Sequence, residues 1–405
     1  MTNATNRSDV AAALPAGRPW PDEAWPFYAE DEIEAAAAVL RSGQVNQWTG
    51  PDVFAFQEAC TERFGGGHGI ALANGSLALE LALRAFGIGP GDEVVVTPRS
   101  FVASAFTVML VGATPVFADV DPDSGNITPE TIARVLTDRT RAIVPVHLAG
   151  WPADMPAIMK LASGRDIKVI EDCAQAHGAS IGGRSVGSFG DAGAFSFCQD
   201  KIISTGGEGG FLSLQDEDAW KWAWSFKDHG KNWDKVNMPA VQSGMFRWLH
   251  DSVGTNWRLT GPQAAIGLRQ LAKLEDWTRL RTRNASIWAR ALNQVPGLRV
   301  PMPAAGIVHA YYKFYFYLDL PTDQAAQRRS EILQRAAEAG LRLFSGSCSE
   351  MYLEEAFRDL PTPDCPVART LTSTSLMVEV HPTLRPDLLE RRAELLASIC
   401  ADVLG

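Results

Sequence analysis

The fold is decided by the stretch Ile170-Glu171-Asp172-Cys173-Ala174-Gln175-Ala176-His177-Gly178, in which a short apolar run ends on two carboxylates. A second strand-like stretch leads to a lysine, Gly193-Ala194-Phe195-Ser196-Phe197-Cys198-Gln199-Asp200-Lys201, and a glycine-rich turn follows over 206–210. Open α/β sheets bind ligands beyond the carboxyl ends of their strands. Glycines nearby let the backbone approach a bound group closely. The two stretches therefore predict a shared ligand site in an α/β protein.

Short strand-like runs alternate with helical segments upstream of this site. The predicted strands cover 69–73, 93–97, 114–119, 142–147 and 168–171. Continuous apolar runs are typical of strands that are buried on both faces, and intervening helical segments are typical of βαβ units. We therefore expect an α/β fold with a mostly parallel sheet flanked by helices.

The rest of the chain is predicted to form an arm and a second, smaller domain. Four prolines prevent a continuous helix in residues 1–26, which are expected to be an N-terminal arm that is partly flexible. Residues 27–270 are assigned to a large domain, and residues 271–405 to a linking helix and a small C-terminal α+β domain. The elements expected outside the βαβ region are helices over 29–42, 53–64, 261–292, 330–339 and 386–403 and strands over 308–318 and 375–379.

Composition excludes several classes of protein. The formal net charge of -10 argues against a protein that binds nucleic acid, which normally presents a basic face. Six cysteines without CxxC spacing indicate neither a zinc site nor a disulfide framework, so no metal is expected. The N-terminus lacks the apolar core of a secretory signal, and the uncharged run 100–118 is interpreted as helix, turn and strand. A cytoplasmic enzyme without membrane contact is predicted.

The residue types in the central stretches match the needs of pyridoxal-phosphate chemistry. Such an enzyme needs a lysine for the imine, a carboxylate that keeps the pyridine nitrogen protonated, and donors around the phosphate. Lys201, Asp172 and Ser196 can supply these groups. Taken alone, Asp172 could equally cap a helix, and a single lysine is usually a surface residue. The order of the motifs, rather than any one residue, favours the chemical interpretation.

The chain resembles the DegT/DnrJ/StrS-type sugar aminotransferases, a family of fold type I pyridoxal-phosphate enzymes. The resemblance runs from about residue 30 to residue 404, and several independent motifs occur in the family's order. The matching pieces are Ser42-Gly43 with Thr49-Gly50-Pro51, Asn74-Gly75-Ser76-Leu77-Ala78-Leu79, 87–92, 171–178, 195–210 and 256–268. The sequence departs from the commoner pattern at Ile202-Ile203, which leaves the chemistry intact but weakens inference about the substrate.

The resemblance implies a role for each candidate cofactor residue. Lys201 would form the Schiff base, Asp172 would pair with the pyridine nitrogen, and Gln175 would donate toward the cofactor hydroxyl. Phe101 would stack on the ring, although a phenylalanine that opens an apolar helix is commonly a core residue. The remaining candidates implied by the resemblance are Gly75, Ser76 and Ser196 for the phosphate, and Asn256, reaching the phosphate of a neighbouring subunit.

Asn256 would make the active site shared across a homodimer. His229 is a candidate for contacting the sugar or the donor's carboxylate, and Trp48 and Thr49 lie in a loop that is a further candidate for the substrate site. The segment 216–257 holds six of the twelve tryptophans, which indicates core or a dimer interface.

The expected reaction moves an amino group from glutamate to a ketosugar, with a nucleotide-linked 4-keto-6-deoxyhexose as the predicted acceptor, in the synthesis of surface polysaccharides or natural-product sugars. A 3-keto sugar, a ketosugar without a nucleotide, or a cyclitol is the alternative, as is a cofactor-binding regulator without turnover. Lys201 argues against a dehydratase of the same scaffold, where histidine is expected at that position. A Rossmann oxidoreductase is disfavoured because no GxGxxG follows the first strand.

Overall fold

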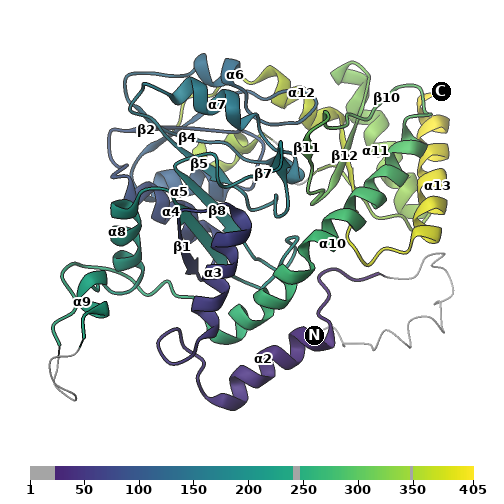
Figure 1. Ribbon diagram of the computed structural model, residues 1–405. Coiled ribbons are helices and arrows are strands. Elements are labelled where there is room, and N and C mark those ends of the chain that lie inside the picture. The colour runs from purple at the N-terminus through teal and green to yellow at the C-terminus, as the bar shows by residue number, and fades with distance from the viewer. Residues whose placement is uncertain (1–22, 240–246, 347–349) are drawn as a thin grey trace.

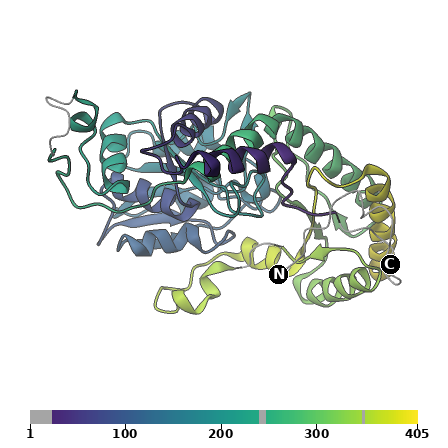
Figure 2. The same ribbon diagram turned by 90° about the horizontal axis from the view of Figure 1, so that it is seen from below.

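The computed structural model describes residues 23–239, 247–346 and 350–405. Two lobes, each built on its own sheet, are joined by the long helix α10 (Gly261–Leu292), which has the bounds expected from the sequence (Figure 1). Seen from below, α2 (Glu30–Ser42) lies along α10, and the C-terminal helix α13 (Pro386–Leu404) forms the outer end of the small lobe (Figure 2). Most of the predicted arm, residues 1–22, lies outside the described residues.

The large lobe is organised around a seven-stranded sheet with the order β1-β9-β8-β5-β4-β2-β3. All neighbouring strands are parallel except β9, which is antiparallel to β1 and to β8, so the prediction of a mostly parallel sheet is confirmed. Nearly all of its residues are buried, as their continuous apolar sequence requires. The strands are β1 (His68–Leu72), β2 (Glu93–Val96), β3 (Thr114–Phe117), β4 (Thr140–Val144), β5 (Lys168–Asp172), β8 (Ala192–Ser196) and β9 (Gly210–Leu214).

Helices cover both faces of this sheet and place loops at its carboxyl edge (Figure 1). The helix α4 (Gly75–Ala85) starts directly after β1 because the Asn74 side chain accepts a hydrogen bond of 3.0 Å from the Leu77 amide. The uncharged run 100–118 forms α5 and β3, as expected, and no helix among the described residues is long and apolar enough to cross a membrane. The other helices are α3 (Asp52–Phe64), α5 (Ala103–Leu110), α6 (Pro129–Ala133), α7 (Met155–Ala162), α8 (Glu217–Lys227) and α9 (Trp233–Asn237).

The small lobe holds an antiparallel sheet of order β10-β12-β14-β13, packed against α10, α11 and α13. The helix expected over 330–339 begins earlier, so α11 covers Thr322–Glu338. The elements are β10 (Leu298–Arg299), β12 (Phe314–Leu318), β13 (Leu343–Phe344), α12 (Pro366–Thr374) and β14 (Ser375–Val378), with 3-10 turns at Met351–Leu353 and Glu355–Phe357.

The single strand expected over 308–318 is wrong in detail. The chain forms β11 (Ile307–Val308), which pairs with a hairpin of the large lobe, and then β12. Between them Tyr311 has a left-handed φ of 48°, and Arg281 Nη1 donates to the Tyr311 carbonyl at 3.1 Å. The strand is therefore broken by a tertiary contact with α10 rather than by a proline or glycine. The hairpin consists of β6 (Ser180–Ile181) and β7 (Arg184–Ser185).

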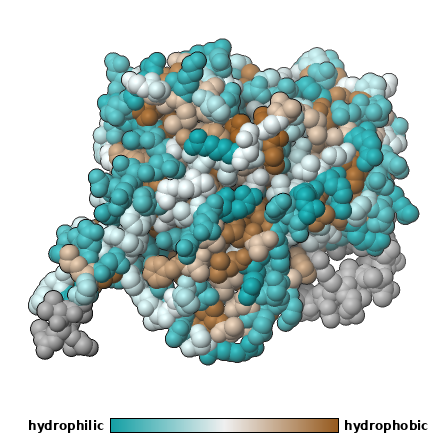
Figure 3. Space-filling view, in the orientation of Figure 1, coloured by the Kyte–Doolittle hydropathy of each residue, from teal (hydrophilic) through white to brown (hydrophobic). Residues whose placement is uncertain are grey.

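The tryptophans of segment 216–257 have two different environments. Trp220 and Trp224 are buried in the large lobe, whereas Trp222 is 44% exposed and Trp248 is 81% exposed. The core interpretation is thus confirmed for Trp220 and Trp224, and the dimer interface stays a prediction. The surface in Figure 3 is mainly hydrophilic, with apolar side chains gathered over the middle of the face.

Candidate active site

Asp172 ends β5 and lies almost completely buried at the carboxyl edge of the sheet. Its Oδ2 accepts a hydrogen bond of 2.8 Å from the Ser104 hydroxyl, and its Oδ1 accepts one of 3.1 Å from the Ala174 amide. Burial raises the pKa of Asp172, while these hydrogen bonds and the positive charge of Lys201 oppose the rise. A second positive charge placed beside this carboxylate would therefore stabilise its ionised form. No helix begins directly after Asp172, so the alternative of a helix cap is wrong.

Lys201 lies in the loop that follows β8, the parallel neighbour of β5. Its side chain is 14% exposed, with Nζ 3.6 Å from Asp200 Oδ1 and 5.0 Å from the centre of the Tyr312 ring. Tyr312 also donates from its hydroxyl to Asp200 Oδ2. Although partial burial opposes it, the charge of Lys201 and the Tyr312 hydroxyl lower the pKa of Asp200. The Lys201 amine is thus held in place by an ion pair with Asp200, whose negative charge partly offsets the positive charge of the amine.

The loop that carries Lys201 is braced by residues near the start of the described chain. Trp25 Nε1 donates to the Lys201 carbonyl at 3.0 Å, and the hydroxyls of Tyr28 and Ser204 are 2.9 Å apart. Sequence reasoning missed Trp25, Tyr312 and Ser104 as parts of the site. Only Ser104 carried a local signal, because it lies one helical turn from Ser100 in an otherwise apolar helix.

Gly75 and Ser196 come together from two different strands. Gly75 opens α4 and Ser196 ends β8, and a Cβ added to Gly75 would lie 2.5 Å from the Ser196 Cβ. Ser76 is exposed on the first turn of α4, so its hydroxyl and the free amides of that turn face outward. A helix N-terminus with a hydroxyl on each side favours a phosphate group. Gly75 and Ser196, two of the predicted phosphate residues, therefore lie side by side with Ser76 next in the chain, and this glycine-serine cradle has room only for glycine at position 75.

Gln175 and Phe101 flank the buried carboxylate. The Gln175 side-chain oxygen accepts a hydrogen bond of 2.7 Å from the Ala149 amide, which leaves its NH₂ group as a donor. Phe101 precedes α5, and its side chain is 66% exposed. The alternative that Phe101 is a core residue, which its apolar neighbours in the sequence had left open, is therefore wrong. Asp172, Lys201, Gln175, Phe101 and the Gly75 cradle match, in residue type and position on the sheet edge, what pyridoxal phosphate requires.

The predicted substrate residues gather around a second buried carboxylate, Asp228. It accepts hydrogen bonds from Trp48 Nε1 at 2.9 Å, Lys231 Nζ at 3.0 Å and Arg258 Nη1 at 2.5 Å. It also forms a backbone bridge with Asn256. No hydrogen bond or ion pair in the described part of the chain links this cluster to Lys201 or Asp172. Sequence reasoning missed Asp228, since an aspartate beside lysines carries no distinctive signal.

His229 and Thr49 belong to the same pair of loops. His229 is exposed and has a left-handed φ of 60°, with its amide donating to the Thr255 carbonyl at 2.7 Å. Strained backbone of this kind persists only where surrounding contacts hold it, and it is common at functional sites. The exposed Thr49 hydroxyl donates to the Asn46 carbonyl at 3.1 Å and closes a local turn.

Lys227 is a completely buried lysine that sequence reasoning also missed. Its Nζ donates to Gln47 Oε1 at 2.8 Å. Burial lowers the pKa of Lys227 to about 7, and the neighbouring charge of Asp228 opposes this shift. The cluster around Asp228 is therefore sensitive to protonation near neutral pH.

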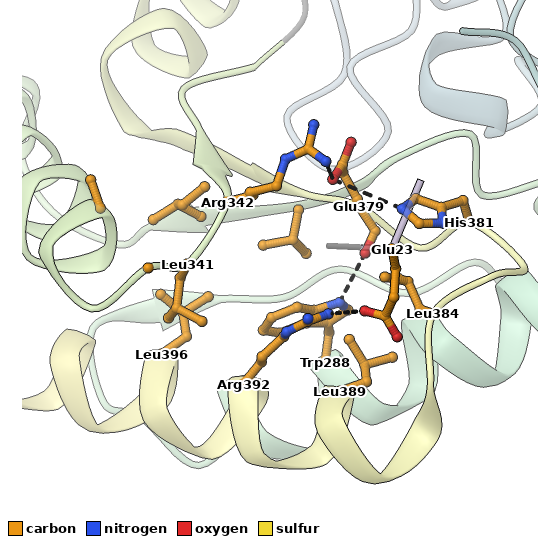
Figure 4. Close-up of a pocket in the computed structure, with 14 residues that line it drawn as sticks. Glu23, Trp288, Leu341, Arg342, Glu379, His381, Leu384, Leu389, Arg392 and Leu396 are labelled. Carbon is orange, nitrogen blue, oxygen red and sulfur yellow. Dashed lines mark hydrogen bonds and ion pairs between the residues drawn. The ribbon is translucent and has the colours of Figure 1, made fainter. Parts of the chain in front are cut away.

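Two other features are not among the predicted site residues. His147, Glu171 and Cys173 offer ligand atoms within 4.8 Å of one another, but Glu171 already accepts from His147 and from three backbone amides over 187–190. A cavity of about 610 Å³ lies in the small lobe between α13 and the sheet, where Trp288, Arg392 and His381 line it (Figure 4). None of the predicted site residues lines this cavity.

The fold and the site together define a pyridoxal-phosphate-dependent aminotransferase of fold type I. A family model, the DegT/DnrJ/EryC1/StrS aminotransferase family, matches residues 26–396. This chain is similar to an aminotransferase from Psychrobacter cryohalolentis whose crystal structure is known. The two sequences are 47% identical, the TM-score is 0.91, and the match covers 95% of this chain and 100% of the other. The chain belongs to the DegT/DnrJ/EryC1/StrS aminotransferase family, and the resemblance stated from the motifs is confirmed.

Two curated relatives show how varied the products of such enzymes are. One is the UDP-N-acetyl-3-dehydro-alpha-D-glucosamine 3-aminotransferase of Acidithiobacillus ferrooxidans, 37% identical over 81% of this chain and 83% of the relative. The other is the 3-amino-5-hydroxybenzoate synthase of Amycolatopsis mediterranei, 33% identical over 84% of this chain and 85% of the relative. The chain is thus a sugar aminotransferase that uses pyridoxal phosphate and small-molecule substrates.

Proposed function

We propose that this enzyme transfers the amino group of glutamate to a nucleotide-linked ketosugar. The observation that carries the proposal is that Lys201 and Asp172 lie at the ends of adjacent parallel strands, beside the glycine-serine cradle. Pyridoxal phosphate, when bound, supplies a reactive carbonyl and an electron-withdrawing ring. All other parts of the chemistry come from side chains of this chain.

Each side chain has one task in this proposal. Lys201 holds the cofactor covalently, and after release its Nζ moves a proton between the substrate carbon and C4′ of the cofactor. Asp172 keeps a proton on the ring nitrogen, and Ser104 holds the carboxylate in place for this. Gln175 donates to the ring hydroxyl, and Phe101 excludes water from one face of the ring.

The acceptor proposed from the sequence is a nucleotide-linked 4-keto-6-deoxyhexose. A nucleotide-linked 3-keto sugar is the second candidate, because the relative from Acidithiobacillus ferrooxidans is named for a 3-dehydro sugar and amination at carbon 3. Both acceptors present a ketone on a pyranose ring, so the same proton transfer by Lys201 serves either of them. The two candidates differ in which carbon of the ring must be turned toward Lys201.

We further propose that the enzyme is a homodimer in which each active site receives residues from both subunits. Phe101, Trp248 and Val253 are apolar and 66%, 81% and 90% exposed, which suits surfaces covered by a second copy. Asn256, exposed on the loop held by Asp228, is the proposed contribution to the partner's phosphate site. His229, Trp48 and Thr49 would then face the substrate bound in the partner.

The proposed reaction is tested with purified enzyme and a panel of keto nucleotide sugars. Glutamate should bleach the visible absorption of the bound cofactor, and addition of the correct ketosugar should restore it. Product mass and stereochemistry then separate amination at carbon 4 from amination at carbon 3. A spectrum that glutamate leaves unchanged would exclude glutamate as the donor, and recovery with cyclitol ketones alone would exclude the nucleotide sugar.

A further inference from the structure

Arg99 is a completely buried arginine that has no counter-charge among the described residues. It follows β2, and its Nε, Nη1 and Nη2 atoms all lack a hydrogen-bond acceptor among the residues that the structure describes. A guanidinium group stays charged in proteins, and an unpaired buried charge is strongly unfavourable. The side chain therefore indicates the place of an anion that is bound during the enzyme's work.

Arg281 shows how a buried arginine is accommodated elsewhere in the chain. It is also almost fully buried, but its Nη1 donates to the Tyr311 carbonyl, and its guanidinium carbon lies 4.9 Å from the centre of the Trp25 ring. Carbonyl oxygens and an aromatic face both stabilise a cation. Arg99 contacts neither a carbonyl oxygen nor an aromatic ring among the described residues. These two buried arginines therefore differ in how their charge is stabilised.

A second arginine, in the small lobe, is influenced by the charge of Arg99. Arg329 of α11 donates from Nη1 to the Thr372 carbonyl, whereas its Nε has no acceptor among the described residues. Burial, and then the positive charge of Arg99, lower the pKa of Arg329. Two cations from different lobes thus lie within reach of each other's field, an arrangement that an anion between them would stabilise.

The carboxylates on neighbouring segments are already engaged. Asp119 accepts hydrogen bonds of 2.9 Å from the Val367 and Ala368 amides at the start of α12. Glu350 accepts from the Tyr352 hydroxyl and lies 3.6 Å from Arg369. In the loop next to the Arg99 side chain, Asp121 accepts from Ser124 and Asp123 pairs with Arg299. None of these carboxylates forms an ion pair with Arg99 in the described structure.

The segment of Arg99 is connected directly to the active site. The next residue, Ser100, has its hydroxyl 3.0 Å from that of Ser104, which in turn donates to Asp172. The phosphate cradle follows β1 and β8, which lie on one side of β5 in the sheet. Arg99 follows β2, which lies on the other side of β5. The anion expected at Arg99 is consequently not the cofactor phosphate.

We propose that Arg99 binds a carboxylate group of a substrate. The planar guanidinium fork matches a carboxylate in a bidentate arrangement, and a fully enclosed side chain suits a small flat anion better than a nucleotide diphosphate. This proposal rests on the proposed aminotransferase function, whose amino donor, glutamate, is one source of the carboxylate. A ketosugar that is itself a uronic acid is the other source, and it would replace the 6-deoxyhexose as the acceptor.

The first experiment measures binding without turnover. Glutarate, an unreactive dicarboxylate, is titrated into holoenzyme while the melting temperature is recorded, for wild type, Arg99→Met and the control Arg290→Met, which changes an exposed arginine of α10. For donor binding we expect glutarate to stabilise wild type and the control, with at least about tenfold weaker binding to Arg99→Met. Without glutarate, Arg99→Met should melt no lower than wild type, because it removes an unpaired buried charge.

The second experiment separates the two sources of carboxylate. Bleaching of the cofactor by glutamate is followed in wild type and Arg99→Met, and its recovery is then compared for a nucleotide-linked ketohexuronate and the matching ketohexose. A defect in bleaching assigns the site to the donor, and a defect confined to the uronate assigns it to the acceptor. If Arg99→Met responds like wild type to glutarate, glutamate and the uronate, the proposal is wrong.

A further variant keeps the proposal testable if Arg99→Met does not fold. Arg99→Lys retains the charge but loses the fork, so it should bind the same carboxylate more weakly while it folds normally. Arg99→Lys with unchanged affinity for all three compounds would overturn the proposal. If wild type is not bleached by glutamate but the uronate still stabilises it through Arg99, the donor assignment fails and the carboxylate site stands.

Discussion

Ser104 Oγ lies 2.8 Å from Asp172 Oδ2, so a hydroxyl of α5 fixes the carboxylate that ends β5. The two residues are 68 positions apart in the chain. Ser100 and Phe101 directly precede α5, and the Ser100 hydroxyl lies 3.0 Å from that of Ser104, so the segment of Arg99 and the exposed ring adjoin the helix that fixes the carboxylate. Changes in this region should therefore affect the site before they affect the fold.

Replacing Lys201 by alanine should abolish covalent attachment of the cofactor while the protein still folds. The side chain is the only part of Lys201 that reaches the crevice, and its carbonyl contact with Trp25 is retained. Borohydride reduction followed by intact mass measurement tests this. Lys160→Ala, which changes an exposed lysine of α7, is the control and should keep the reduced adduct. An adduct that persists in Lys201→Ala would place the covalent bond at another lysine.

Asp172→Asn should keep the covalent adduct but reduce turnover about 100-fold or more, because a neutral amide no longer stabilises a protonated ring nitrogen. Single-turnover bleaching by the amino donor measures the effect. Ser104→Ala keeps the charge and loses one hydrogen bond, so a loss of only about fivefold is expected. Equal losses in both variants would contradict the assigned role of the carboxylate.

Gly75→Ala should weaken cofactor binding about tenfold or more. The added Cβ would lie 2.5 Å from the Ser196 Cβ, so α4 and β8 must move apart and widen the phosphate cradle. Equilibrium titration of apoenzyme with pyridoxal phosphate gives the affinity. Gly89→Ala is the matched control, since the nearest atom to its Cβ would be 3.6 Å away. The cradle assignment fails if the two variants bind the cofactor equally well.

Asp228→Asn should destabilise the loops that carry Trp48, His229 and Asn256. The side chain is fully buried and accepts from two cations, so loss of its charge leaves both uncompensated, at a cost of about 3 kcal/mol. Chemical denaturation should show this loss, and substrate KM should rise more than kcat falls. Asp251→Asn, which breaks an exposed ion pair with Lys235, should change stability by less than about 1 kcal/mol.

Lys227 should make stability depend on pH. The pKa of Lys227 is about 7 in the folded protein, whereas its ordinary value is 10.5. At a pH between these two values, the unfolded chain therefore binds more protons than the folded protein. Stability of wild type therefore rises with pH across this window, by up to about 1.4 kcal/mol per pH unit. Lys227→Met removes the slope, so its gain over wild type should be largest below about pH 7 and should shrink at higher pH. Denaturation curves at several pH values test this, and a pH-independent difference would contradict it.

Local patterns predicted much of the fold. The buried strands were recognised from continuous apolar runs, and α10 has the bounds that its helical spacing predicted. The apolar runs of the strands and the helical spacing of α10 each lie within a single element, so residues close together in the sequence are enough to predict them. The strand expected over 308–318 failed for the opposite reason, because the contact of Arg281 with the Tyr311 carbonyl breaks it.

The sequence by itself determined the class of enzyme, through motifs in the family's order, and it predicted Asp172, Lys201 and the glycine-serine cradle as site residues because they follow recognisable strands. Only the tertiary structure decided what surrounds them: Ser104 on the carboxylate, Tyr312 beside the amine, Asp228 at the centre of the loops, and an Arg99 guanidinium with no acceptor in the described part of the chain. These relationships join residues far apart in the chain. Their energies depend on burial and on the distance between charges, and neither quantity exists until the chain has folded.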